Sequence, residues 1–148
     1  MTMELKKPGA ALLVTCLLAC LLGTAYGAEN AIKVEPLLQT STSWDGARYK
    51  QYPAGKPQLS IVRVTIPPHT EMPWHTHPIP NAGYILSGEL TVERQDGSAK
   101  KHYVAGQTIP ETVDTVHRGV TGDSEAVLIV FYAGANGLPL SQPVKNKQ

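Results

Sequence analysis

The sequence predicts an all-β domain that follows an N-terminal signal peptide. Three observations favour this class of protein. Residues 1–27 have the anatomy of an export signal, and residues 58–134 hold several short alternating segments separated by Gly and Pro. Between Pro57 and Gly134, moreover, the pattern predicts no helix of three turns. Short strands with turn signals at this spacing are typical of a β-sandwich or a β-barrel, and the pattern alone does not choose between them.

The export signal begins with Lys6 and Lys7, continues as an apolar run over residues 10–22 and ends in small residues before Ala28. This order predicts cleavage after Gly27 and a periplasmic or secreted mature protein. The run is short for a membrane-spanning helix, so an uncleaved anchor is the less favoured alternative. Residues 17–20 loosely resemble a lipobox, and a lipoprotein anchored at Cys20 is therefore the other alternative.

Composition narrows the chemistry of the mature domain. Both cysteines, Cys16 and Cys20, lie in the signal segment, so the mature domain has no disulfide, thiolate ligand or thiol nucleophile. The signal also removes two of 13 basic and one of 12 acidic residues, which leaves no formal net charge. Since no basic block remains, nucleic acid is excluded as a partner.

The mature chain divides into an N-terminal arm, a barrel domain and a tail. The arm, residues 28–57, has turn signals at 44–46 and 52–55, and a short edge strand is expected at 36–39. The first strand of the barrel domain, at 59–66, places Val62, Val64 and Ile66 on one face and ends at a Pro-Pro pair. The tail, residues 135–148, is polar and contains prolines, so it is expected to fray.

The next run, at 84–93, predicts one long strand with a bend or bulge at Gly88. An Asp96-Gly97 turn predicts a hairpin into a strand at 100–104, and further strands are expected at 115–120 and 126–133. The alternation in the long run is expected to gather four apolar residues on one face: Tyr84, Leu86, Leu90 and Val92.

Three histidines carry the chemistry of this domain. His75 and His77 are two residues apart, so on a strand their imidazoles point to the same face, and His117 lies in another expected strand. An isolated H-x-H pair is usually a surface feature, and the surrounding spacing therefore has to decide. Three imidazoles suit a divalent ion such as Mn, Fe, Ni or Zn and leave coordination positions open for water or substrate.

That spacing resembles the two motifs of the cupin superfamily. His75-Thr76-His77 followed by Gly88 resembles the first, G-x5-H-x-H-x3,4-E-x6-G. Gly106, followed eleven residues later by His117, resembles the second, G-x5-P-x-G-x2-H-x3-N. The resemblance covers residues 59–132. It implies a cupin-type β-barrel (a double-stranded β-helix or jelly roll) in which the three histidines bind a metal near the wider mouth.

The sequence departs from the cupin pattern at the fourth ligand. Asn81 stands where cupins usually have glutamate, and this replacement removes a negative charge from the expected site. Asn81 could still ligate through its neutral carbonyl oxygen or hydrogen-bond a metal-bound water. Glu111 offers a second solution, because it precedes His117 by six residues and shares its face on a regular strand. Four other motif positions also differ: His69, Thr112, Asp114 and Thr121.

The remaining polar candidates have two interpretations each. Asp114 either orients the His117 imidazole or forms a turn. His69 and His102 are expected at the surface, outside the metal site. Trp74 and Tyr84 are expected in the core or in the wall of the pocket.

A fold does not settle a function, and three hypotheses remain open at this point. The first is an exported metal-dependent enzyme of dioxygenase, isomerase or decarboxylase type that acts on a small organic molecule. The second is a non-catalytic module that binds a small ligand or a metal, which an outward-pointing Glu111 would favour. The third is a metal-free, epimerase-like barrel. The resemblance also implies a homodimer formed by sheet extension through the N-terminal arm.

Overall fold

The computed structural model describes residues 31–144, and within that range the regular elements are nine strands. The predicted signal peptide lies outside the described residues. The strands are β1 (Pro57–Ile66), β2 (His75–Thr76), β3 (Asn81–Ser87), β4 (Glu89–Arg94), β5 (Lys100–Val104), β6 (Thr108–Pro110), β7 (His117–Val120), β8 (Ala126–Ala135) and β9 (Gln142–Pro143).

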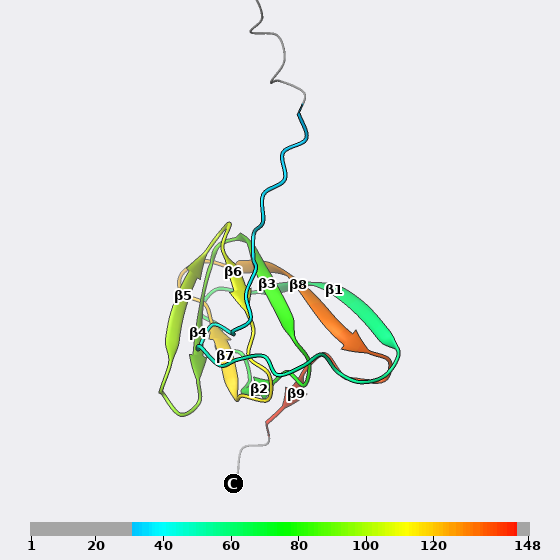
Figure 1. Ribbon diagram of the computed structural model, residues 1–148. Helices are drawn as coiled ribbons and strands as arrows, with labels where there is room; N and C mark the ends of the chain where they lie inside the picture. The colour runs from blue at the N-terminus through cyan, green and yellow to red at the C-terminus, as the bar shows by residue number, and fades with distance from the viewer. Residues whose placement is uncertain (1–30, 145–148) are drawn as a thin grey trace, which may run out of the picture. The chain divides into compact units, whose positions relative to one another are not determined.

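The strands form two antiparallel sheets, as Figure 1 shows. One has the order β1-β8-β3-β6, and the other has the order β5-β4-β7-β2-β9. Apolar side chains from both sheets meet in one core, so the prediction of an all-β domain is confirmed. The buried core residues are Trp44, Ile66, Ile79, Ile85, Leu90, Val92, Tyr103, Ile109, Ala126, Leu128, Val130 and Tyr132.

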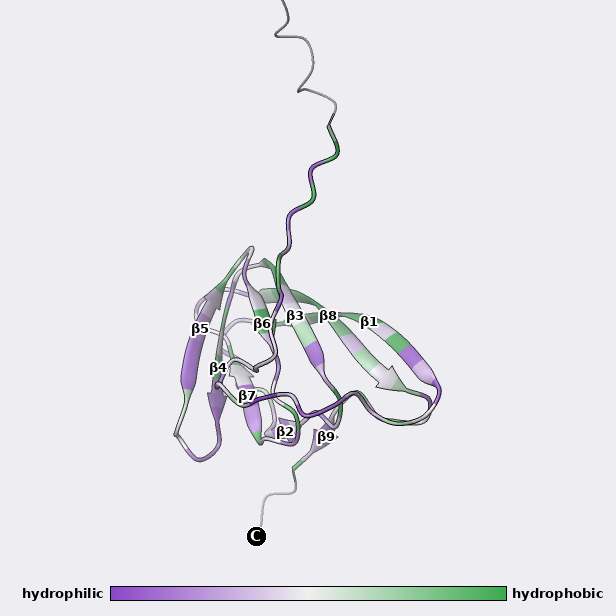
Figure 2. Ribbon diagram, in the orientation of Figure 1, coloured by the Kyte–Doolittle hydropathy of each residue, from purple (hydrophilic) through white to green (hydrophobic). Residues whose placement is uncertain are grey.

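Strand β1 follows the alternation expected from the sequence. Its whole length pairs with β8, from Pro57 opposite Ala135 to Ile66 opposite Ala126. Val62 and Val64 turn toward the core, whereas Ile61 on the other face is 69% exposed. Figure 2 shows the resulting bands of hydrophobic and hydrophilic residues along the strand.

The expected long strand at 84–93 is two strands that lie in different sheets, and the expectation of one shared face is wrong. Leu90 and Val92 are in the core, but Leu86 is 41% exposed and Ile85 is buried in its place. The physical reason is a register shift against β8 between Ile85 and Ser87, followed by a left-handed φ of 74° at Gly88. These two irregularities change the phase of the alternation as the chain crosses between the sheets.

Replacing Gly88 with alanine is expected to lower the free energy of unfolding by about 3 kcal/mol or more. The added Cβ would lie 1.8 Å from the carbonyl oxygen of Glu125, in a backbone conformation that already disfavours side chains. Gly97→Ala is the matched control, because Gly97 has a φ of 70° but no atom lies within 4 Å of the position that an added methyl group would take. Urea unfolding should show a loss of only about 1 kcal/mol for the control. Equal losses in the two variants would contradict the steric argument.

The two ends of the domain differ from expectation. Residues 36–39 form no strand, and the backbone carbonyl of Leu37 instead accepts a hydrogen bond from the Thr108 hydroxyl. The expectation that the tail frays is wrong for the residues up to Val144, because β9 pairs with β2 and the Val144 N–H donates to the Trp74 carbonyl. Backbone pairing therefore brings the tail against the segment that carries His75 and His77.

The part of the chain that the structure describes contains no helix with the length and apolar character needed to cross a bilayer.

Candidate metal centre

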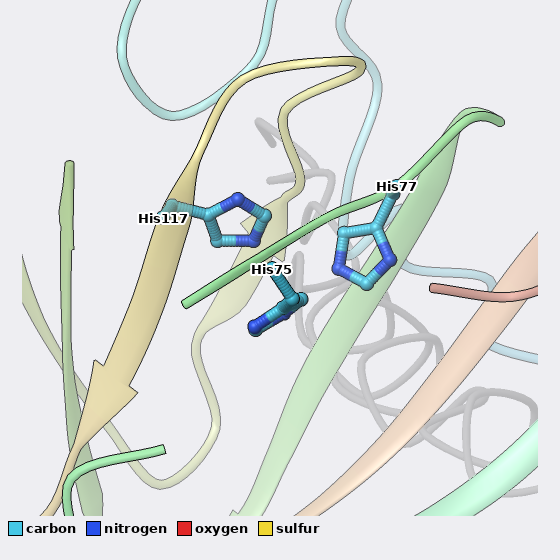
Figure 3. Close-up of side chains that lie close together, drawn as sticks. All are labelled: His75, His77 and His117. Atoms are coloured by element: carbon cyan, nitrogen blue, oxygen red, sulfur yellow. The ribbon is translucent and has the colours of Figure 1, made fainter. Parts of the chain in front are cut away.

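The three histidines come together through strand pairing. His75 in β2 lies directly opposite His117 in β7, and His77 follows two residues after His75. Figure 3 shows the three imidazoles turned toward a common space. Their ring centroids are 4.6 to 5.1 Å apart, and one nitrogen from each ring lies within 4.8 Å of the other two. The three residues could therefore hold one metal ion.

Hydrogen bonds orient all three rings in the same way. Each Nδ1 contacts a backbone carbonyl, which can only accept, so each Nδ1 carries the proton. In the neutral ring, Nε2 consequently has the free lone pair, which is the form of histidine that binds metals. The contacts are His75 with Pro73 at 2.9 Å, His77 with Leu140 at 2.7 Å and His117 with Thr115 at 2.8 Å.

Two oxygen-bearing side chains complete the polar end of the site. Asn81 is buried at the start of β3, where its Nδ2 donates to the Ile79 carbonyl at 3.1 Å. Glu111 follows β6, and its backbone N–H donates to the Asn81 carbonyl. One carboxylate oxygen, Oε2, lies 3.3 Å from His117 Nε2. Glu111 thus points inward. Its carboxylate oxygens, however, do not belong to the group of histidine nitrogens that all lie within 4.8 Å of one another.

The buried polar atoms at this site fit a bound cation. Among the described residues, Asn81 Oδ1, Glu111 Oε2 and His117 Nε2 are buried without a hydrogen-bond partner, since the 3.3 Å contact lacks the alignment of a hydrogen bond. Leaving such an atom unsatisfied costs about 1–3 kcal/mol. All three residues line one cavity, and nitrogen and oxygen atoms are the ligands that divalent first-row metals accept.

Burial and charge divide the histidines into two kinds. Burial lowers the pKa of His75 and of His77, so both imidazoles are neutral near pH 7. Burial opposes the charge of His117 as well, but the close contact with the Glu111 carboxylate outweighs it and raises the pKa of His117. For the same reason the pKa of Glu111 is lowered despite its burial. Metal ligation at His117 therefore has to displace a proton that the Glu111 carboxylate favours.

The metal site opens into a small cavity of about 60 Å³, lined by the three histidines, Asn81, Glu111 and several aliphatic residues. A larger hollow of about 560 Å³ lies between residues 38–52 and the outer face of β3 and β8. That hollow has Asn81 in its lining but none of the three histidines. The three histidines and Glu111 thus face the small cavity and not the larger hollow.

Glu111 reaches the site by a different route from the one that strand parity predicted. Glu111 and His117 are not on one regular strand, because a loop separates β6 from β7. Asp114 is exposed in this loop with a φ of 57°, so it is a turn residue. The interpretation that Asp114 orients His117 is wrong, since the Thr115 carbonyl and the Thr112 hydroxyl, at 3.0 Å, contact that Nδ1 instead.

The other candidates lie outside the cavity, as expected for His69 and His102, whose side chains are 72% and 52% exposed. Trp74 packs against the Arg118 guanidinium, 4.3 Å above its ring, and is not part of the cavity wall. Tyr84 is on the outer face of β3 and is also absent from the wall.

Sequence reasoning missed three groups around the site. The Tyr132 ring packs edge-on against His77 with centroids 5.8 Å apart, and the alternation of β8 could have placed it inside. The Tyr49 hydroxyl donates to the Glu111 backbone carbonyl at 2.7 Å. The third group is the Leu140 carbonyl. Contacts made to main-chain oxygens leave no signal in residue type, so neither of these last two could be found from the sequence.

The fold and the three-histidine site define the class of protein, and comparison with known families agrees. Residues 62–132 match the sequence model of the cupin domain. These residues form a cupin domain, as the motif spacing predicted. No curated protein matches the sequence.

Solved structures with the same fold include enzymes with several chemistries. A DMSP lyase from Ruegeria pomeroyi is 21% identical, with a TM-score of 0.52 over 58% of this chain and 43% of that chain. A polyketide cyclase from Streptomyces resistomycificus is 18% identical, with a TM-score of 0.52 over 64% of this chain and 65% of that one. An oxalate decarboxylase from Lactobacillus farciminis is 18% identical, with a TM-score of 0.50 over 58% and 26%. The chain spans less than half the length of the lyase, and these likenesses show the fold alone.

Proposed function

We propose that this protein is an exported cupin that binds a divalent metal through His75, His77 and His117 and acts on a small organic molecule. Glu111 or Asn81 supplies an oxygen to the same ion. The observation that carries the proposal is the shared orientation of the imidazoles: three Nδ1 protons are held by backbone carbonyls, which leaves three Nε2 lone pairs in one small space.

The surrounding residues support an enzyme more than a non-catalytic module. Glu111 points inward, so a carboxylate is available to accept or return a proton beside the metal ligands. The aliphatic walls offer no hydrogen bonds to water in the space that a substrate would occupy. The metal, when bound, supplies Lewis-acid chemistry or, if it is redox-active, electron transfer. A binding module with the same site is the second candidate, because the cavity admits a ligand whether or not it reacts.

Protein purified from its own envelope without chelators is expected to contain about one equivalent of manganese, iron, nickel or zinc, because the donor set is complete in one chain. Elemental analysis measures this content directly. Protein that is isolated without metal and also fails to take up each of the four ions would contradict the proposal. That result would favour the metal-free, epimerase-like alternative.

Export is the part of the proposal that rests on the sequence alone. The mature protein is expected to begin at Ala28, because the small residues Ala25 and Gly27 follow the apolar run. Intact-mass measurement of protein from the cell envelope tests this prediction. A chain that begins at a lipidated Cys20 would instead establish the lipoprotein alternative, and an uncut chain would establish the membrane anchor.

A further inference from the structure

Apart from Tyr132, whose ring packs against His77, the walls of the cavity away from the histidines are aliphatic. Val64 of β1 and Leu128 and Val130 of β8 line it from the four-stranded sheet, while Leu90 and Val92 line it from β4. These side chains cannot hydrogen-bond, so any polar group of a ligand that faces them loses its water without compensation. The part of a ligand that points away from the metal ligands must therefore be apolar.

No lysine or arginine lines the cavity within the described part of the chain. Arg94 pairs in register with His117, yet its guanidinium binds Asp45 and Asp96. Arg118 follows His117 directly, yet its guanidinium binds Glu71 and Glu93. Both arginines that adjoin His117 are thus committed to carboxylates elsewhere, and neither can receive an anionic group of a ligand.

The charges at the site allow one anionic group and no more. A divalent ion and the Glu111 carboxylate together carry one net positive charge, because the metal-binding histidines are neutral. One carboxylate or enolate of a ligand neutralises the site. A second anionic group would be a buried charge with no partner, which is strongly unfavourable in an apolar cavity.

The cavity volume limits the size of the ligand. A water-sized position needs roughly 10–15 Å³, so about 60 Å³ holds an ion and a compound of a few non-hydrogen atoms. From the aliphatic walls, the absent cation and this volume, we infer that the natural ligand is a small organic monoanion with a short aliphatic end. It binds through its anionic oxygen at the metal. The inference rests on the proposed metal site and specifies its substrate class.

Calorimetric titration of the zinc-loaded protein with simple acids tests the inference. Affinity is expected to rise about fourfold with each added carbon from formate through acetate to propionate, because each carbon is buried against the aliphatic wall. The gain should end by butyrate, where the cavity is full. Butyrate should also bind at least tenfold more tightly than succinate or β-alanine, which have a similar length and carry a carboxylate or an ammonium group at the far end.

Two variants of one wall residue sharpen the test. Met72 lines the cavity and is half-buried, and lysine and glutamine are both of similar length. Met72→Lys supplies the missing cation and should reverse the preference, so that succinate binds more tightly than butyrate. Met72→Gln is the matched control without a charge and should leave butyrate ahead of succinate.

The outcomes separate this inference from the proposed function. Wild-type protein that takes up no metal overturns the proposed function, and this inference falls with it. Metal-loaded wild-type protein that binds succinate or β-alanine as tightly as butyrate, or that gains nothing from formate to propionate, overturns the inference alone. The wild-type series decides the question even if neither Met72 variant folds.

Discussion

Replacing His75, His77 and His117 together by alanine is expected to abolish metal binding while the barrel still folds. Metal at a thousandfold excess over its dissociation constant stabilises a protein by about 4 kcal/mol. For a domain of this size, that corresponds to a rise in Tm of roughly 10 °C or more. The wild-type protein should show this rise on metal addition, and the triple variant should show none. Differential scanning calorimetry with and without metal measures both.

The two surface histidines provide the matched control. His69 and His102 are exposed and lie outside the cavity, so their joint replacement by alanine should leave both the metal stoichiometry and the Tm rise unchanged. Circular dichroism of the metal-free triple variant should retain the β spectrum, which separates ligand loss from unfolding. If the triple variant keeps one equivalent of metal, the ion binds elsewhere and the assignment of the site is wrong.

The second large effect is expected at the carboxylate. Glu111→Gln should weaken metal binding on the order of a hundredfold, because it removes the only negative charge among the described residues that line the cavity. Asn81→Ala should cost less, since it removes a neutral oxygen. Competition with a chromogenic chelator at fixed pH gives both affinities. Glu89→Gln, on the exposed face of β4, controls for the loss of a carboxylate as such.

Asn81→Glu tests whether the side chains at positions 81 and 111 bind the same metal ion. Asn81→Glu should partly restore metal affinity to the Glu111→Gln variant, because it returns a carboxylate to the usual cupin position. In the wild-type background the same change places two carboxylates near one ion, and the like charges raise each other's proton affinity. The gain there should be small and should grow with pH. An unchanged affinity in Glu111→Gln would remove Glu111 from the site.

The sequence predicted the parts of this fold that depend on alternation and on histidine spacing. The inward face of β1 and the meeting of His75, His77 and His117 follow from side-chain periodicity and from the cupin-like spacing. Alternation fails where the backbone is irregular. The register shift and the left-handed Gly88 moved Leu86 outward, because a one-residue change in phase exchanges the two faces of a strand.

Glu111 lies beside His117 for a different physical reason from the one that the sequence suggested. The sequence placed it on the same regular strand as His117, but the two residues belong to different segments joined by a loop that turns at Asp114. Glu111 points inward because its backbone N–H extends the pairing of β6 with β3 at Asn81. Such a long-range backbone contact is independent of side-chain type, so no pattern in the sequence could reveal it.

The contact between His77 and Leu140 links the candidate metal site to the C-terminal end of the described chain. The two residues are 63 positions apart, and the carbonyl that holds the His77 proton lies in the last segment described. The His77 imidazole gains its orientation only when β9 has paired with β2 and the Leu140 carbonyl is in place. A chain clipped after Gly137 loses this anchor. Metal content would therefore report whether the C-terminal segment is intact.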